Sequence, residues 1–185
     1  MKKLIIDMDD VICEKNFIEM VNDFLKTNYK EDDACSYYIN DLIPENKMNE
    51  WIEFFGRNNL YEYGKQSEDA KVVLEKLNKI YDIYIVTAYV FRDDESLSGK
   101  VLKDKFEYLY KNFSFLNSNK YIFANNKELI DADIRIDDNI NNLKGKAETK
   151  LLFTAYHNKK LTNDELRSNN IIRVNNWREI ENILM

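Results

Sequence analysis

The chain has 185 residues, of which 44% are hydrophobic and 32% are charged, a balance typical of a soluble globular protein with one sizeable core. The net charge of −6 argues against a general surface for nucleic acid polymers. The apolar stretches are too short to span a bilayer, and Asp7 interrupts the N-terminal apolar run too early for a signal peptide. We therefore expect a cytoplasmic protein without membrane attachment, with Cys13 and Cys35 as free thiols.

The N-terminal part begins with a strand and continues with helices. Leu4 to Ile6 reads as a buried strand. Apolar residues follow at helical spacing between Phe17 and Leu25, and again between Met48 and Phe55. A polar stretch with several tyrosines separates them. Two helices without a clear strand indicate that residues 15–64 form a helical lobe inserted after the first strand.

From Ser67 onward, helices and strands alternate. Ser67 can cap a helix that carries Val72 to Leu77, and further helices are indicated at Leu102 to Tyr110 and at Trp177 to Leu184. β-Branched and apolar runs predict strands at residues 83–86, 121–123, 134–136, 151–153 and 171–174. This alternation predicts an α/β fold, with a parallel sheet and helices on both faces. Residues 1–14 and 65–185 would form this core.

The first strand runs directly into three acids, Asp7, Asp9 and Asp10. Several like charges at a strand end are costly to bury unless a cation or a reaction uses them. Asp7 and Asp9 are two residues apart, so in extended geometry their side chains share one face. One could hold a metal and attack a substrate while the other exchanges a proton. The alternative is an acid-rich turn after an edge strand, because D-x-D alone is a weak signal.

Three later strands also lead into polar or reactive residues, and ligands of open parallel sheets bind beyond the carboxyl ends of the strands. In chain order these residues are Thr87 with Ala88, Lys127, and Asp137 with Asp138. Each has an ordinary alternative: a hydroxyl that caps a loop, a solvated lysine, or acids in a turn. Chance convergence of four strand ends on the same chemistry is much less expected.

Together these residues suit phosphoryl transfer, in which positioning and charge neutralisation dominate. Mg²⁺ prefers a few carboxylates with water and a phosphate oxygen, and Asp7 and Asp137 could supply those carboxylates. Thr87 and Lys127 could bind the remaining phosphate oxygens. Asp7 is then the natural nucleophile, forming an aspartyl phosphate. Asp9 would protonate the leaving oxygen and then deprotonate the attacking water.

This set of residues resembles the four motifs of the haloacid dehalogenase-like (HAD) phosphatases, in their order. The motifs are D-M-D-D-V at residues 7–11, T-A at residues 87–88, Lys127, and I-D-D at residues 136–138. Within that superfamily the chain looks most like the 5′(3′)-deoxyribonucleotidases, through the runs at residues 84–88 and 126–138. The resemblance spans the whole chain.

The resemblance implies a Rossmann-like core with an inserted helical cap, dependence on Mg²⁺, and (deoxy)nucleoside monophosphates as substrates. The implied roles are nucleophile for Asp7, acid/base for Asp9, phosphate binding for Thr87, Ala88 and Lys127, metal binding for Asp7, Asp137 and the backbone carbonyl of Asp9, and support behind the metal ligands for Asp138. The partner would be a small phosphate monoester. The oligomeric state stays open.

Two positions depart from the nucleotidase pattern. Asp10 stands where many of these enzymes have glycine, and Lys15 stands where an aromatic side chain packs on the base. Phe17, two positions away, and Trp51 are the candidates for contact with the base. Helical spacing also suits Trp51 to the core of the lobe itself. The single histidine, His157, lies in a polar segment and is expected to be exposed to solvent.

Three other functions remain open. The same chemistry could act on another small phosphate, such as a sugar phosphate. A receiver-type signalling domain also carries acids, a threonine and a lysine at strand ends, but it lacks both an inserted lobe and an acidic pair such as Asp137 and Asp138. A phosphate-binding protein without catalysis is the last alternative, although every expected catalytic position is filled here.

Overall fold

Six parallel strands form the central sheet of the computed structural model, which describes residues 1–34 and 36–185. In chain order they are β1 (Lys3–Ile6), β4 (Asp82–Thr87), β5 (Tyr121–Phe123), β6 (Ile134–Asp137), β7 (Thr149–Phe153) and β8 (Ile171–Val174). Their order across the sheet is β5-β4-β1-β6-β7-β8, and each neighbouring pair is parallel. The predicted α/β class with a parallel sheet is confirmed.

The central position of β1 follows from its composition. Leu4, Ile5 and Ile6 are all buried, as expected for a strand of a parallel sheet that is covered on both faces. Ile6 pairs with Ile85 of β4 on one side and with Ile136 of β6 on the other. Because of this register, the residues that follow β1, β4 and β6 emerge beside one another at the same edge of the sheet.

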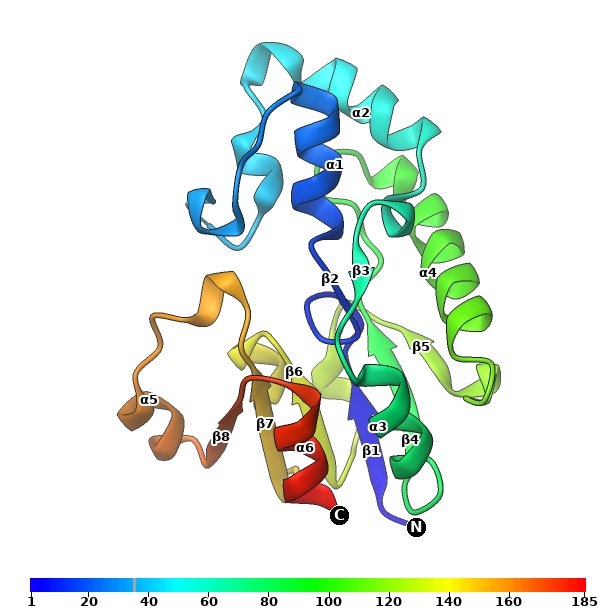
Figure 1. Ribbon diagram of the computed structural model, residues 1–185, viewed down its shortest axis with the longest axis vertical. Helices are drawn as coiled ribbons and strands as arrows, with labels where there is room; N and C mark the ends of the chain where they lie inside the picture. Colours follow the sequence, from blue (N-terminus) through cyan, green and yellow to red (C-terminus); the bar gives the residue numbers. More distant parts are fainter. Residues whose placement is uncertain (35) are drawn as a thin grey trace.

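Two helices lie side by side over one face of the sheet, α3 (Ala70–Leu77) and α6 (Trp177–Leu184) (Figure 1). The apolar stripe of α6 is buried, and the Trp177 indole donates a hydrogen bond to the carbonyl of Val11 at 2.9 Å. The start of α3 differs from the prediction. Ser67 lies three residues before it, and the Ser67 carbonyl, not its hydroxyl, accepts a hydrogen bond from the Ala70 amide at 3.1 Å.

Two more helices connect strands of the sheet. Helix α4 (Ser98–Asn112) joins β4 to β5, and α5 (Asn163–Ser168) joins β7 to β8. The short helix α5 was not predicted. It begins with a capping box, in which the Thr162 hydroxyl accepts from the Glu165 amide at 3.3 Å and the Glu165 carboxylate accepts from the Thr162 amide at 2.7 Å. Its six residues expose most of their side chains, so they give little apolar periodicity.

A narrow pair of strands leads to the helices between β1 and α3. Strand β2 (Cys13–Glu14) pairs antiparallel with β3 (Lys65–Gln66). At Gly64 a Cβ atom would lie 2.4 Å from the Glu14 carbonyl oxygen, so the close approach of the two segments requires glycine. Between these strands, α1 (Asn16–Leu25) and α2 (Met48–Arg57) stand above the carboxyl end of the sheet (Figure 1).

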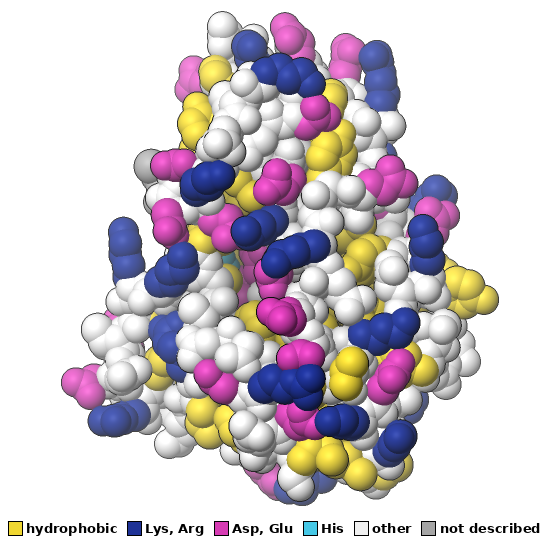
Figure 2. Space-filling model, viewed as in Figure 1, with side chains coloured by type: hydrophobic (Ala, Val, Ile, Leu, Met, Phe, Trp, Pro, Cys, Tyr) yellow, Lys and Arg dark blue, Asp and Glu magenta, His cyan; other side chains and the backbone are white. Residues whose placement is uncertain are grey.

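Trp51 and Phe55 of α2 form the interior of this helical segment. Both are buried, and the Trp51 ring lies 5.4 Å from the Phe24 ring of α1, measured between centroids. On the face seen in Figure 2, acidic and basic side chains are interspersed. Among the described residues, no helix combines the length and the apolar character needed to cross a membrane. Cys13 is a buried free thiol, whereas the predicted free thiol of Cys35 lies outside the described residues.

Candidate active site

Three predicted site residues, Asp7, Lys127 and Asp137, are in contact at the carboxyl ends of β1 and β6. The Asp7 amide donates to the Ile136 carbonyl at 3.0 Å, which places Asp7 beside Asp137. The Lys127 ammonium lies 2.8 Å from Asp7 Oδ1 and 2.7 Å from Asp137 Oδ2. All three side chains are buried. The structure therefore assembles a carboxylate–lysine–carboxylate group from three separate segments of the chain.

Local hydrogen bonds fix each member of this group. Asp7 Oδ1 accepts from the Met8 amide at 2.7 Å. Asp137 Oδ1 accepts from the Asn139 amide at 2.9 Å and from the Asn142 side chain at 3.0 Å. These contacts leave the carboxylates little freedom to rotate, as a site for in-line chemistry requires.

The turn that carries Lys127 is tied to the sheet. Arg135 of β6 donates from Nη1 to the Lys127 carbonyl at 3.3 Å, and its other guanidinium nitrogen donates to the Ile130 carbonyl. Asn126 accepts from the Glu128 amide at 3.2 Å, which closes the turn 127–129. The Lys127 side chain is thereby aimed back at the ends of β1 and β6.

One lysine does not balance the negative charge at this place. Burial raises the pKa of Asp137, and the charge of Asp7 raises it further, so that the pKa reaches about 8 despite Lys127. Burial acts on Asp7 in the same direction, but the ammonium groups of Lys127 and Lys105 hold the pKa of Asp7 below its usual value. Burial would lower the pKa of Lys127, and its two carboxylate partners raise it instead. Lys127 therefore stays charged, and an additional cation would be stabilised beside it.

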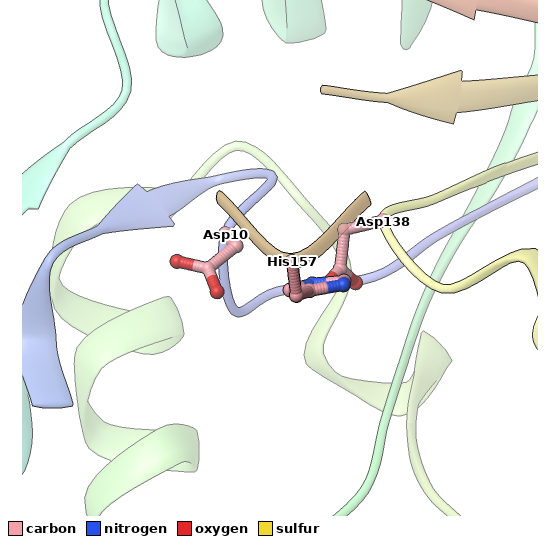
Figure 3. Close-up of side chains that lie close together, drawn as sticks. All are labelled: Asp10, Asp138 and His157. Atoms are coloured by element: carbon pink, nitrogen blue, oxygen red, sulfur yellow. The ribbon is translucent and has the colours of Figure 1, made fainter. Parts of the chain in front are cut away.

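Asp138 lies next to this group and contacts His157 (Figure 3). His157 Nε2 is 2.6 Å from Asp138 Oδ2, and the expectation that His157 is exposed is wrong, since its side chain is 9% exposed. Its ring packs edge-on against Tyr37 and Tyr156, with centroids 4.7 Å and 5.0 Å away. Asp10 completes a cluster in which one ligand atom of each of Asp10, Asp138 and His157 lies within 4.8 Å of the others. Burial excludes the histidine from solvent although its sequence neighbours are polar.

The carboxylates of Asp7, Asp137 and Asp138 suit a divalent cation. One oxygen of each lies within 4.8 Å of the others, and all three side chains are buried. Asp138 Oδ1 is buried and has no hydrogen-bond partner among the described residues. Burial and the charge of Asp7 raise the pKa of Asp138 well above its usual value, so its ionised form needs a positive partner. Clustered hard oxygen donors fit Mg²⁺, so Asp138, which was expected to support the metal ligands from behind, could itself supply an oxygen beside Asp7 and Asp137.

Asp9 and Thr87 are joined by Lys105, a lysine that was not among the predicted site residues. Lys105 of α4 donates to Asp9 Oδ2, and also to Thr87 Oγ1 at 2.6 Å. The other oxygen of Asp9 accepts from the Tyr61 hydroxyl at 2.8 Å. A signal for Lys105 was present, because it lies four residues from both Val101 and Leu109 on the buried stripe of α4. A charged residue at a core position of a helix indicates a buried partner.

A cavity of about 560 Å³ opens beside these residues. Asp9, Ala88 and Lys105 line it on the core side, and Phe17 and Lys15 are among the residues that line it from the helical segment. Ala88 is exposed, whereas the neighbouring Thr87 side chain is buried. The cavity provides room for a small organic group next to the predicted phosphate site.

Trp51 does not line this cavity. Its ring is fully buried, and besides Phe24 it contacts Phe54 and Phe55, with centroids 6.2 Å and 5.8 Å away. The amphipathic spacing of α2 directs Trp51 into the interior of the helical segment, as the alternative interpretation expected. Of the two aromatic residues predicted to contact a substrate, the structure places Phe17 at the cavity and Trp51 away from it.

Comparison with known proteins gives the family. The model of the family described as 5′ nucleotidase, deoxy (Pyrimidine), cytosolic type C protein matches residues 1–185. The chain belongs to this family. Two proteins named 5′(3′)-deoxyribonucleotidase, from Bacillus subtilis (strain 168) and from Bacillus phage SPbeta, are each 32% identical to it over 189 residues, with all of both chains covered. The predicted resemblance to 5′(3′)-deoxyribonucleotidases is confirmed.

A solved structure supports the fold. The haloacid dehalogenase-like hydrolase SP0104 from Streptococcus pneumoniae matches with a TM-score of 0.51 over 100% of this chain and 99% of its own, at 12% identity. This likeness confirms the predicted HAD-like fold. Membership of the nucleotidase family makes the protein a phosphoric monoester hydrolase, as predicted, and sets aside the receiver-type alternative.

The backbone conformation of Asp10 bears on its departure from the nucleotidase pattern. Asp10 adopts a φ of 55°, in the left-handed region that glycine enters without steric cost. Aspartate and asparagine are the side chains that tolerate this region best. The backbone conformation therefore suits the aspartate of this chain, and it would equally suit the glycine that the resemblance led us to expect here.

Proposed function

We propose that the protein is a Mg²⁺-dependent phosphomonoesterase that hydrolyses (deoxy)nucleoside monophosphates through an aspartyl phosphate on Asp7. One observation carries the proposal: at the strand ends, the Lys127 ammonium lies within 2.8 Å of carboxylate oxygens of both Asp7 and Asp137. Asp9 and Thr87, both bonded to Lys105, stand at the same edge of the sheet. Family membership supports a nucleotide as the substrate.

In the first step, a carboxylate oxygen of Asp7 attacks phosphorus and the bond to the leaving oxygen breaks. Asp9 gives its proton to that oxygen, so that the nucleoside departs as an alcohol. In the second step, Asp9 takes a proton from water, the water oxygen attacks phosphorus, and the bond to Asp7 breaks. Inorganic phosphate is released and both aspartates return to their starting states.

The remaining groups hold the phosphate in line with Asp7. The Lys127 ammonium would neutralise charge, while the Thr87 hydroxyl and the Ala88 backbone amide would donate to phosphate oxygens. Mg²⁺, held by carboxylates of Asp7, Asp137 and Asp138 and by the carbonyl of Asp9, would supply further positive charge next to the nucleophile and the phosphate.

We further propose that residues 15–64 act as a cap over a core of residues 1–14 and 65–185. The short β2–β3 pair supports this division, because it is where the chain enters and leaves the helical segment. Residues 15–64 also contact the part of the core that follows β7. Lys159 pairs with Asp32 at 2.7 Å, and the Tyr156 hydroxyl donates to the Tyr37 carbonyl. The cap would enclose the leaving group and select it, since the strand-end residues handle the phosphate alone.

A substrate panel tests this function. Purified protein with Mg²⁺ should release phosphate faster from 5′ or 3′ nucleoside monophosphates than from any sugar phosphate, measured as kcat/KM. Asp7→Asn protein prepared in parallel reports contaminating phosphatases. If a sugar phosphate is hydrolysed faster than every nucleotide, the nucleotide assignment is wrong and the phosphatase assignment stands. If no monoester is hydrolysed, the phosphatase assignment fails as well.

Phe17 and Trp51 should respond differently to truncation. Phe17→Ala removes a ring that lines the cavity, so we expect KM for the preferred nucleotide to rise, with little change in the free energy of unfolding. Trp51→Ala removes a fully buried ring and should cost about 3–5 kcal/mol of stability, with KM unchanged for the folded fraction. Steady-state kinetics and urea unfolding of both variants separate the two effects. A stable Trp51→Ala protein with a raised KM would instead place Trp51 at the substrate.

A further inference from the structure

Lys105 is a charged side chain in an apolar position. It is 3% exposed, in line with Val101 and Leu109 on α4, where an apolar residue would complete the buried stripe. Burying an ammonium group is costly unless it is paired and hydrogen-bonded. Its two hydrogen-bond partners in the described residues are Asp9 and Thr87, which carry separate roles in the proposed reaction.

The contact with Thr87 sets the direction of a hydrogen bond. A lysine ammonium can only donate, so Thr87 Oγ1 must accept from it. The hydroxyl proton of Thr87 is then free to be donated elsewhere. The carbonyl of Ala88 is 3.4 Å from Thr87 Oγ1, which is long for a bond between a hydroxyl and a carbonyl. Lys105 thus orients the hydroxyl as a donor that an incoming phosphate oxygen can use.

The contact with Asp9 fixes a carboxylate whose side chain is 30% exposed. One of its oxygens accepts from Lys105 and the other from the Tyr61 hydroxyl at 2.8 Å, so rotation of the group is restricted from both sides. The carboxylate retains further lone pairs to carry the proton that it gives to the leaving oxygen and takes back from water. The two contacts of Lys105 connect Asp9 after β1 to Thr87 at the end of β4.

We propose that Lys105 is a positioning residue of the reaction, which holds the Asp9 carboxylate and the Thr87 hydroxyl in one fixed arrangement around the phosphorus centre. The inference rests on the proposed function, because it assumes that Asp9 exchanges the proton and that Thr87 binds phosphate. It adds a residue that acts through these two and makes no bond to the reacting atoms. Fixed donors are worth most where they are buried, as Lys105 is.

The test combines Lys105→Met with a mutant cycle. Methionine has a similar length and suits the buried stripe, so the fold should persist, as circular dichroism and the melting temperature would show. We expect kcat to fall by roughly 10²–10³, the order found when a single buried donor is removed, while KM changes by less than about threefold. Lys103→Met is the matched control, since Lys103 lies on the same helix with a 68% exposed side chain, and its kcat should stay within about twofold of wild type.

The same substitution is then made in Asp9→Asn and Thr87→Val backgrounds. A residue that acts through Asp9 and Thr87 should cost less than about fivefold further in either background, because the partner it positions is already lost. A residue needed merely for the fold would multiply the loss by the same 10²–10³ each time. If Lys105→Met does not fold, Lys105→Gln takes its place in the cycle.

Two results overturn the inference: a Lys105→Met kcat within about threefold of wild type, or losses that multiply fully in both backgrounds. Neither result touches the proposed function as long as the wild-type protein hydrolyses nucleotides. A wild-type protein without activity on any phosphate monoester would remove the proposed function itself.

Discussion

Asp7→Asn is expected to abolish phosphate release while leaving the fold intact. The substitution removes the attacking carboxylate and one of the three clustered acids, so turnover should fall by several orders of magnitude. The amide oxygen of asparagine can still accept hydrogen bonds from the Met8 amide and from the Lys127 ammonium, so the local hydrogen bonds are preserved. Phosphate release from the preferred nucleotide and the circular dichroism spectrum are the measurements.

Asp131→Asn serves as the matched control. Asp131 is exposed and lies on the loop between Lys127 and β6, so the same chemical change there should leave turnover within about twofold of wild type. Acid-quenched Asp7→Asn protein should also carry no phosphate after mixing with substrate. A folded Asp7→Asn protein with substantial turnover would contradict a covalent intermediate on Asp7.

Removal of divalent metal should abolish activity, and Mg²⁺ should restore it. The reason is the charge of the site: three buried carboxylates converge, and burial together with the charge of Asp7 raises the pKa of Asp137 to about 8 although Lys127 is in contact with it. Ca²⁺ should substitute poorly, since its larger and looser coordination shell would misplace the phosphate. Turnover is measured after dialysis against a chelator and after return of each metal. Full activity in metal-free buffer would contradict the proposed metal site.

Metal binding should also be visible without substrate. A ligand that binds the native state raises its stability, by about 2.7 kcal/mol at a hundred times Kd. Mg²⁺ should therefore raise the melting temperature of the wild-type protein. Asp137→Asn should reduce this increase, because one of the three clustered carboxylates is lost. An equal increase in both proteins would place the bound Mg²⁺ elsewhere.

Much of the sheet and the placement of Asp7 beside Asp137 were predictable, because both depend on local patterns. The apolar residues of β1 and β6 predict two strands. Their parallel pairing then places Asp7 and Asp137 at the same edge of the sheet. Ser67 shows the limit of local patterns. It was predicted to cap α3, but the helix begins after Asp69, which takes a φ of 61°, and no side chain of the described residues caps it.

The parts that the sequence did not predict depend on contacts between distant segments. Lys105 is separated by 96 residues from Asp9, and a lysine among helix-forming residues normally reads as solvated. His157 is covered by Tyr37, from a segment 120 positions earlier, so the polarity of its sequence neighbours gave the wrong burial. Trp51 fits either a core or a ligand contact, and the packing of α1 against α2 decided between them.

The β2–β3 pair makes the protein suitable for exchange of the helical segment, residues 15–64, for another insert. Cys13 pairs with Gln66 in this antiparallel ladder. The points where the chain leaves and rejoins the core of residues 1–14 and 65–185 are therefore neighbours, about 5 Å apart. An insert whose ends lie equally close could replace residues 15–64 without stretching the sheet, provided that it supplies a hydroxyl for Asp9 in the place of Tyr61. Gene recombination at the β2–β3 pair could exchange the insert in the same way. The protein could then acquire a new substrate range while the strand-end residues stay unchanged.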